Sequence, residues 1–130
     1  MNRMWQLLAL SAATLVACSQ VLELMCQDKI QQRASAPDGS LEAILFSEDC
    51  NATSYETLVV LGSKRETLKA ARQQGDLFAV NGSCEITLHW EGSRKLVIAG
   101  KVGRKHIIDQ AIRWRDVDVG YELTEPDEDR

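Results

Sequence analysis

The chain lacks the residue spacings from which most metal and catalytic sites are built. Its two histidines, His89 and His106, stand alone in a chain of 130 residues. No Cys-x-x-Cys motif occurs, so the spacing typical of structural zinc sites is missing. No serine lies in a Gly-x-Ser-x-Gly nucleophile elbow. The sequence therefore predicts no metal ligand, no catalytic residue and no enzyme activity.

An excess of basic residues is also missing. Lys and Arg total 15 against 19 for Asp and Glu, and the formal net charge is -4 at pH 7. Domains that bind nucleic acid normally carry a basic footprint, so nucleic acid is not expected as a partner. The length of 130 residues suits one domain of ordinary size rather than two.

No apolar run reaches the roughly 20 residues that a membrane-spanning helix needs. The apolar stretch Leu7–Ala17 follows Arg3 and has the length and flanking charge of a secretory signal peptide. The alternative is an uncleaved membrane helix that continues to Met25. That helix would place Gln20 and Glu23 in or near the hydrocarbon, at up to a few kcal/mol for the Glu. The signal peptide is therefore the preferred interpretation.

A cysteine, Cys18, stands where a signal peptide would be cut. With Leu15, Val16 and Ala17 it resembles a bacterial lipobox: branched apolar residues, a small residue, then cysteine. The resemblance implies cleavage before Cys18, a diacylglycerol on its thiol and often a third acyl chain on its amino group. Two or more acyl chains anchor a protein stably to a membrane. Ser19, in place of an Asp after the cysteine, implies transport to the outer membrane, facing the periplasm.

We expect one folded domain after this segment. The fold class is α+β, a mainly antiparallel β sheet of about six to seven strands with one short helix. The expected organisation is a lipoprotein signal peptide at 1–17, a lipid anchor and leader at 18–34, a single β-rich domain at 35–123 and an acidic, disordered tail at 124–130.

Turn residues between apolar segments predict where the first elements lie. Pro37 and Gly39 mark a turn, followed by a strand over 41–46 and a returning strand over 56–62. Ser63 and Glu66 have capping-box spacing, and Gly75 sits where a helix should stop, so the helix is predicted over 64–74. Two further strands are predicted over 95–100 and 117–123.

Asn81-Gly82, between two apolar runs, is the strongest hairpin signal in the chain and predicts a hairpin over 77–90. Because side chains alternate along a strand, its second arm should have two different faces. The expected apolar face carries Cys84, Ile86, Leu88 and Trp90, and the expected polar face carries Glu85, Thr87 and His89.

Two segments, 86–100 and 110–123, share the order strand, tryptophan, polar turn, apolar strand. We interpret them as two similar hairpins of one antiparallel sheet, in which Trp90 and Trp114 each cover an edge of the core. The alternative is a ligand site lined by the two tryptophans.

The region around residue 50 resembles a group of small bacterial envelope lipoproteins with no established activity. Their pattern is a cysteine, then Ser-Pro-Asp-Gly, an Ala-containing strand and Asp-Cys-Gly-Ala-Thr. Ala36 replaces the usual Ser here and Asn51 the usual Gly, and Asn tolerates a left-handed backbone well. The resemblance covers residues 26–62 and bears on the fold and a disulfide. The matching positions are Cys26, Pro37-Asp38-Gly39, Ala43, Asp49-Cys50 and Ala52-Thr53.

Three cysteines remain besides Cys18, and an exported chain meets an oxidising compartment. The pairing we predict is Cys26 with Cys50, with Cys84 left free as a small hydrophobe on the apolar strand face. The alternative joins Cys50 to Cys84 and leaves Cys26 in a flexible leader.

Charge is unevenly placed near the C-terminus. Basic residues dominate 94–115, and acids dominate 116–130. One hypothesis is that the basic segment meets an anionic partner, which could be lipid head groups, lipopolysaccharide or an acidic protein face. The other is a solvated hairpin neutralised by its own acidic tail. The basic residues that would make the contact are Arg94, Lys95, Lys101, Arg104 and Lys105.

The function these features indicate is a lipid-anchored binding or accessory protein of the bacterial envelope, of inhibitory or immunity type, without catalytic activity. It needs no cofactor beyond the covalent lipid on Cys18. One alternative is a structural envelope lipoprotein with no specific target. The other is a small hydrolytic enzyme, which would need a pocket that brings His89 or His106 together with carboxylates.

Overall fold

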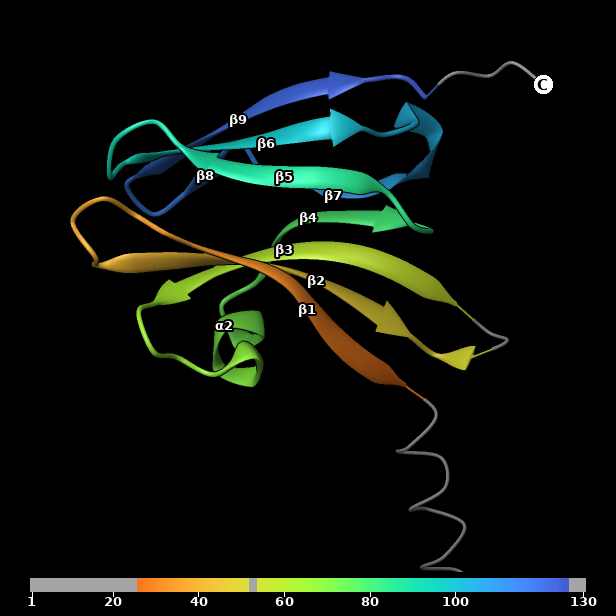
Figure 1. The fold of residues 1–130 in the computed structure, drawn as a ribbon, viewed down its shortest axis with the longest axis horizontal. Helices are drawn as coiled ribbons and strands as arrows, with labels where there is room; N and C mark the ends of the chain where they lie inside the picture. The colour runs from red at the N-terminus through yellow and green to blue at the C-terminus, as the bar shows by residue number, and fades with distance from the viewer. Residues whose placement is uncertain (1–25, 52–53, 127–130) are drawn as a thin grey trace, which may run out of the picture.

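The computed structural model describes residues 26–51 and 54–126. The predicted signal peptide, the predicted lipid site at Cys18 and residues 127–130 of the acidic tail lie outside these ranges. The described chain forms nine strands in two sheets, mostly antiparallel, with one short α-helix. The mainly antiparallel fold is thus confirmed. The expected number of six to seven strands was too low. The sheets stack face to face, and the helix lies on the outer side of one of them (Figure 1).

The larger sheet has the strand order β1-β2-β3-β4-β7, and every neighbouring pair in it is antiparallel. Its first strand lies almost entirely in the segment 18–34 that the sequence predicts as a leader, so the sheet starts earlier than expected. The strands are β1 (Gln27–Ser35), β2 (Leu41–Asp49), β3 (Tyr55–Ser63), β4 (Asp76–Asn81) and β7 (Ile107–Gln110).

The smaller sheet has the order β5-β6-β9-β8. β6 and β9 run parallel, which the expectation of two side-by-side hairpins did not include, while the other two pairs are antiparallel. A single turn of 3₁₀ helix, η2 (Arg104–His106), connects β6 to β7. The strands are β5 (Glu85–Trp90), β6 (Lys95–Lys101), β8 (Arg113–Trp114) and β9 (Val117–Thr124).

The middle strands of the larger sheet are buried on both faces, which explains their unbroken apolar sequences. One face packs against the smaller sheet, and its residues include Leu45, Val59 and Phe78. The other face, with Phe46 and Leu58, is covered by the helix α2 (Leu68–Gln73). The sequences of these strands are therefore continuous apolar runs and do not alternate between apolar and polar residues.

The helix is shorter than the predicted 64–74 and starts at a different cap. Thr67 is its N-cap, and the Thr67 hydroxyl accepts a hydrogen bond from the amide of Ala70 at 3.1 Å. Ser63 is the last residue of β3, and Arg65 has a φ of 78°, so the backbone there cannot be helical. The capping-box prediction was wrong because the chain is still leaving the sheet at Ser63.

The Asn81-Gly82 hairpin was also a wrong prediction. β4 pairs with β3 on one edge and with β7 on the other, while β5 pairs with β6 in the second sheet. Gly82 has a φ of 91°, and its amide donates to the carbonyl of Tyr55 at 2.7 Å. Because both edges of β4 are occupied, this glycine turns the chain from one sheet to the other.

The turn at Asp38 and the face alternation of β5 agree with the sequence. The Ser40 amide and hydroxyl both donate to the Asp38 carboxylate, and Gly39 adopts a φ of 75°. In β5 the side chains of Ile86, Leu88 and Trp90 are buried, and those of Glu85, Thr87 and His89 are exposed. A period-two pattern with one buried face is the signature of a strand on the surface of a sandwich.

Cys26 and Cys50 form a disulfide, with a Cα–Cα distance of 3.9 Å, which confirms the predicted pairing. The bond joins the residue before β1 to the residue after β2. Among the described cysteines, Cys84 is free and half-buried against the core. Burial raises the pKa of the Cys84 thiol, as expected for a cysteine that packs as a small hydrophobe.

The two tryptophans lie on β5 and β8, at opposite edges of the smaller sheet. Trp90 is buried, and its indole N–H donates to the carbonyl of Ala34 at 2.9 Å. The guanidinium of Arg115 stacks over the ring of Trp114, 4.5 Å from its centroid. The strand order separates the two rings, so they do not line one common site.

One side of the sandwich is closed by contacts between its edge strands. The side-chain amide of Gln32, on β1, donates to the carbonyl of Leu88 and accepts from the amide of Leu88, on β5. The Trp90 indole adds its bond to Ala34 beside this pair. The Gln32 amide therefore replaces a strand partner for β5 at this position. The opposite side of the sandwich, where β7 and β9 face each other, contains a cleft.

Candidate functional site

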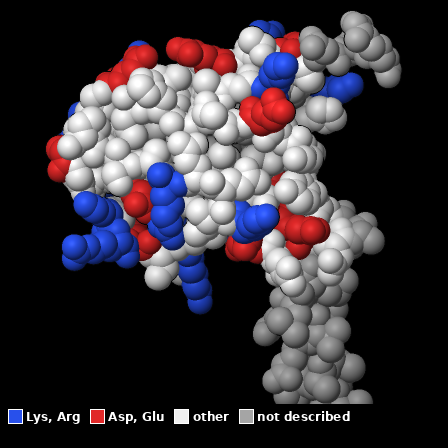
Figure 2. Space-filling model, in the orientation of Figure 1, with Lys and Arg blue, Asp and Glu red and all other residues white. Residues whose placement is uncertain are grey.

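The five basic residues proposed from the sequence do not form one patch. Arg94 and Lys95 lie at the start of β6, and Lys101 lies at its end. At about 3.3 Å per residue, the Cα atoms of Lys95 and Lys101 are roughly 20 Å apart. Figure 2 shows acidic and basic side chains interspersed over one face of the molecule, with neither sign covering it alone.

The cations at the start of β6 are already paired. Arg94 lies 3.0 Å from Asp116 and 3.9 Å from Asp38, and Lys95 lies 3.4 Å from Glu91. Of these three acids, only Asp116 comes from the acidic stretch after residue 115. These pairs are exposed and individually weak, but each places an acid beside the cation and so lowers the positive potential at this end.

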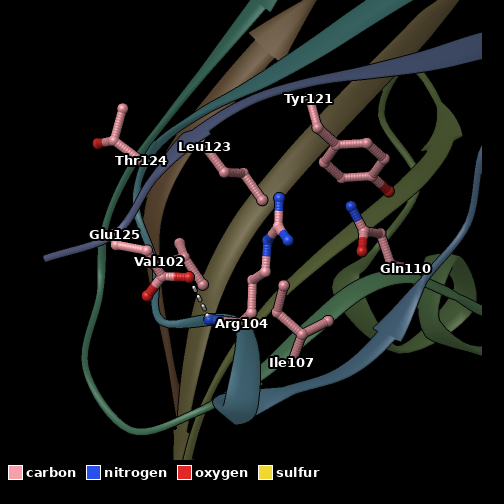
Figure 3. A pocket seen from close by; sticks show the side chains of 8 residues that line it. All are labelled: Val102, Arg104, Ile107, Gln110, Tyr121, Leu123, Thr124 and Glu125. Carbon is pink, nitrogen blue, oxygen red and sulfur yellow. Dashed lines mark hydrogen bonds between the residues drawn. The ribbon is translucent and has the colours of Figure 1, made fainter.

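At the other end, Lys101, Arg104 and Lys105 take part in none of the ion pairs found among the described residues. Lys101 lines two hollows beside Cys84 and Glu85, whereas Arg104 lines a different and larger cleft. The cleft has a volume of about 710 Å³ and lies between η2 and β7 on one side and β9 on the other. Its lining residues, drawn in Figure 3, are Val102, Arg104, Ile107, Gln110, Tyr121, Leu123, Thr124 and Glu125.

Arg104 is held in this cleft through its backbone. Its amide donates to the Glu125 carboxylate at 3.2 Å, so Glu125 fixes the position of η2. The side chain extends across the cleft, and its guanidinium points toward Leu123 on β9 (Figure 3). A guanidinium presents five N–H donors in a planar fork that suits a carboxylate or phosphate. The cleft therefore offers a positioned cation to an anionic group.

Tyr121 lines the same cleft. Its hydroxyl donates to the carbonyl of Ala111 at 2.5 Å, and its ring lies 5.4 Å from the ring of Phe78, centroid to centroid. Burial raises the pKa of Tyr121 to about 12. This side chain lines the cleft and links β9 to the segment after β7.

The raised pKa of Tyr121 gives a pH-dependent stability with a defined sign. The folded state favours the neutral phenol, so this contribution is complete below pH 10 and is lost as the pH rises through about 12. We expect the wild-type protein to lose stability relative to Tyr121→Phe over this range. Urea unfolding of both proteins at pH 8 and pH 11.5 measures the difference, and an equal difference at both values would contradict the assignment.

A second hollow, of about 490 Å³, lies beside α2 and contains Arg72. This arginine already contacts other residues of the fold. It lies 2.6 Å from Glu48 and 3.5 Å from Asp28, and it stacks over the ring of Phe46 at 5.0 Å. The other cation of this hollow, Lys69, is exposed and takes part in none of the ion pairs among the described residues, but it lacks the planar guanidinium fork of Arg104. The cleft at Arg104 is therefore the better candidate.

The two histidines lie on different elements. His89 is exposed on β5. His106 is exposed in η2, where it lines a hollow of about 540 Å³ together with Cys84 and Glu85. Within 26–51 and 54–126, no group of His, Cys, Asp and Glu side chains could hold a metal ion. No helix among these residues has the length and apolar character to cross a membrane.

Sequence reasoning identified Arg104 and missed the residues around it. Gln110, Tyr121 and Glu125 come from three different segments, and only the fold brings them to Arg104. One signal was available: Tyr121 is a residue with a polar group on a strand face whose other members are Val117, Val119 and Leu123. A hydroxyl on an apolar face needs a partner when it is buried.

Comparison of the chain with protein-family models, with curated proteins and with solved structures gives no match. We therefore infer the function of this chain from its own residues.

Proposed function

We propose that this protein is a non-catalytic binding module of the bacterial envelope, anchored through a lipid on Cys18, that receives a partner in the cleft between β7 and β9. The observation that supports the proposal is the position of the Arg104 side chain. Its guanidinium extends across a cleft of about 710 Å³ and has no ion-pair partner among the described residues. An inhibitory, immunity-type or accessory lipoprotein would use such a cleft to recognise one envelope protein.

The proposed anchor limits where that partner lies. Residues 19–25 separate Cys18 from the disulfide-bonded Cys26. Seven residues span at most about 25 Å when fully extended. A lipid on Cys18 would therefore keep the folded domain within that distance of the membrane surface, and its partner would be another component of the envelope.

Site-specific photo-crosslinking in cells tests the binding role. A photoreactive amino acid at Gln110, an exposed residue of the cleft, should give a discrete crosslinked product with a partner protein. The matched control is the same amino acid at Thr87, which is exposed on β5 in the closed side of the sandwich. Products absent from both positions, or equally abundant at both, would contradict the proposal.

A separate experiment tests the proposed lipid anchor on Cys18. We expect Cys18→Ser to leave an uncleaved precursor or to release the protein from membranes, because the acylated thiol is lost. Cys84→Ser is the control, since Cys84 is a half-buried free thiol of the folded domain. Membrane fractionation and mass spectrometry of the mature N-terminus give the answer. A mature chain that starts elsewhere, or that carries no acyl mass, would exclude the lipid anchor.

A further inference from the structure

The outer edge of β9 is open where it borders the cleft. The amide of Asp118 points toward β6 and donates to the carbonyl of Arg94. The amide of Val119 points away from β6 and donates to the carbonyl of Ile112. Backbone groups of successive strand residues point to opposite edges, so those of Tyr121 and Leu123 point away from β6, toward the cleft. β8 pairs with β9 through Val117 and Asp118 alone, and no other strand of the described chain continues that edge.

An open strand edge is a template for pairing with another extended chain. The closed side of the same molecule shows how such an edge is otherwise satisfied, because Gln32 bonds to the backbone of Leu88 there. At the cleft, no side-chain amide of the described residues bonds to the backbone of Tyr121 or Leu123 in this way. The backbone of β9 is thus able to accept a further strand.

The side chains around this edge suit a peptide with a carboxylate. The guanidinium of Arg104 points toward Leu123, on the edge itself (Figure 3). Val102, Ile107 and Leu123 give the cleft apolar surface beside that charge. Peptides that add to a sheet edge bind by main-chain hydrogen bonds and are selected by pockets for alternate side chains. A carboxylate on one of those side chains would meet Arg104 with charge-assisted hydrogen bonds.

We propose that the cleft binds one extended segment of a partner protein, which adds as a strand to the edge of β9 at Tyr121 and Leu123 and places an Asp or Glu carboxylate on Arg104. This inference rests on the proposed binding function and specifies its partner chemistry. The neighbouring cations Lys101 and Lys105, which have no ion pairs among the described residues, add to the attraction for an acidic segment.

The test uses a random peptide library displayed on phage and selected on the purified full chain in detergent. We expect the enriched peptides to alternate β-branched residues with at least one Asp or Glu. Binding of the best peptide should fall at least tenfold in Arg104→Gln, since the substitution removes a charge-assisted contact with the peptide carboxylate. The matched control is Arg94→Gln, whose side chain pairs with Asp116 at the far end of β6 and whose affinity should stay within about twofold.

N-methylation of the selected peptide distinguishes strand addition from simple charge pairing. Methyl groups on alternate amides block one edge of the peptide and leave its carboxylate in place. One of the two alternately methylated peptides should lose binding, and the other should keep it. On binding of the unmodified peptide, exchange of the Tyr121 and Leu123 amide hydrogens should slow at least tenfold.

Three outcomes would overturn the inference: enriched peptides without acids, equal binding by Arg104→Gln, or two methylated peptides of equal affinity. Selection of no peptide, together with Arg104-dependent binding to phosphatidylglycerol vesicles, would also overturn it and assign Arg104 to a lipid surface. A crosslink from Gln110 that persists in Arg104→Gln would refute the acidic strand while leaving the binding function intact. Absence of that crosslink would refute both.

Discussion

Removing the Cys26–Cys50 disulfide, by Cys26→Ser with Cys50→Ala, is expected to lower the free energy of unfolding by about 3–4 kcal/mol. The bond closes a loop between residues 24 positions apart, and its loss frees the unfolded chain to explore more conformations. The loss is large against the ~5–15 kcal/mol typical of a domain. Urea unfolding at equilibrium measures it.

The experiment is cleanest in a Cys84→Ala background, because a free thiol would otherwise exchange with the disulfide. In that background the effect of adding reductant to the disulfide-bonded protein should match the effect of the double substitution. Reduction that leaves the unfolding midpoint unchanged would show that the disulfide does not stabilise the fold. The strands β1 and β2 would then hold together through their ladder alone.

Phe78→Ala is expected to lower the free energy of unfolding by about 3–5 kcal/mol. The Phe78 side chain has no exposed surface and lies on β4, between the two sheets. Truncation removes buried apolar area and leaves a cavity that the close-packed neighbours fill only in part. Thermal or urea unfolding gives the size of the loss.

Phe78→Leu is the matched variant, since it keeps an apolar side chain and should show a smaller loss. The same pair reports on the cleft, because the ring of Phe78 contacts that of Tyr121 at 5.4 Å. Near-ultraviolet circular dichroism should show a less ordered Tyr121 in Phe78→Ala than in Phe78→Leu. A loss below about 1 kcal/mol for the alanine variant would contradict the position of Phe78 in the core.

Local features of the fold could be predicted from the sequence, because they depend on residues close together in the chain. The turn at Asp38 follows from a carboxylate two residues before the amide it binds. The buried and exposed faces of β5 follow from the alternation of its side chains. Both features are present as the sequence indicates.

The incorrect predictions were also local signals, and distant partners decided against them. Asn81-Gly82 favours a tight hairpin, yet β4 has β3 and β7 on its two edges and leaves no place for β5. Ser63 has the spacing of a helix cap, yet it still belongs to β3. In both cases pairing within the sheet outweighed the propensity of a short segment.

The candidate site likewise combines a residue that the sequence could indicate with contacts that only the fold determines. Arg104 could be named from the charge of its segment, and Arg94 from the same pattern, but the sequence does not tell which of the two is paired. The structure places Asp38 and Asp116 beside Arg94 and leaves Arg104 across a cleft from β9. Contacts between residues distant in the chain make this distinction.

The sequence by itself determined the mainly antiparallel class, the turns and the faces of β5, and it indicated the pairing of Cys26 with Cys50. Each of these follows from side-chain alternation, turn chemistry or the position of cysteines along the chain. Only the tertiary structure decided the split into two sheets, the parallel pairing of β6 with β9 and the open edge at Tyr121. The reason is physical: each strand has two edges and two faces, and the segment that occupies each of them is chosen by competition over the whole chain.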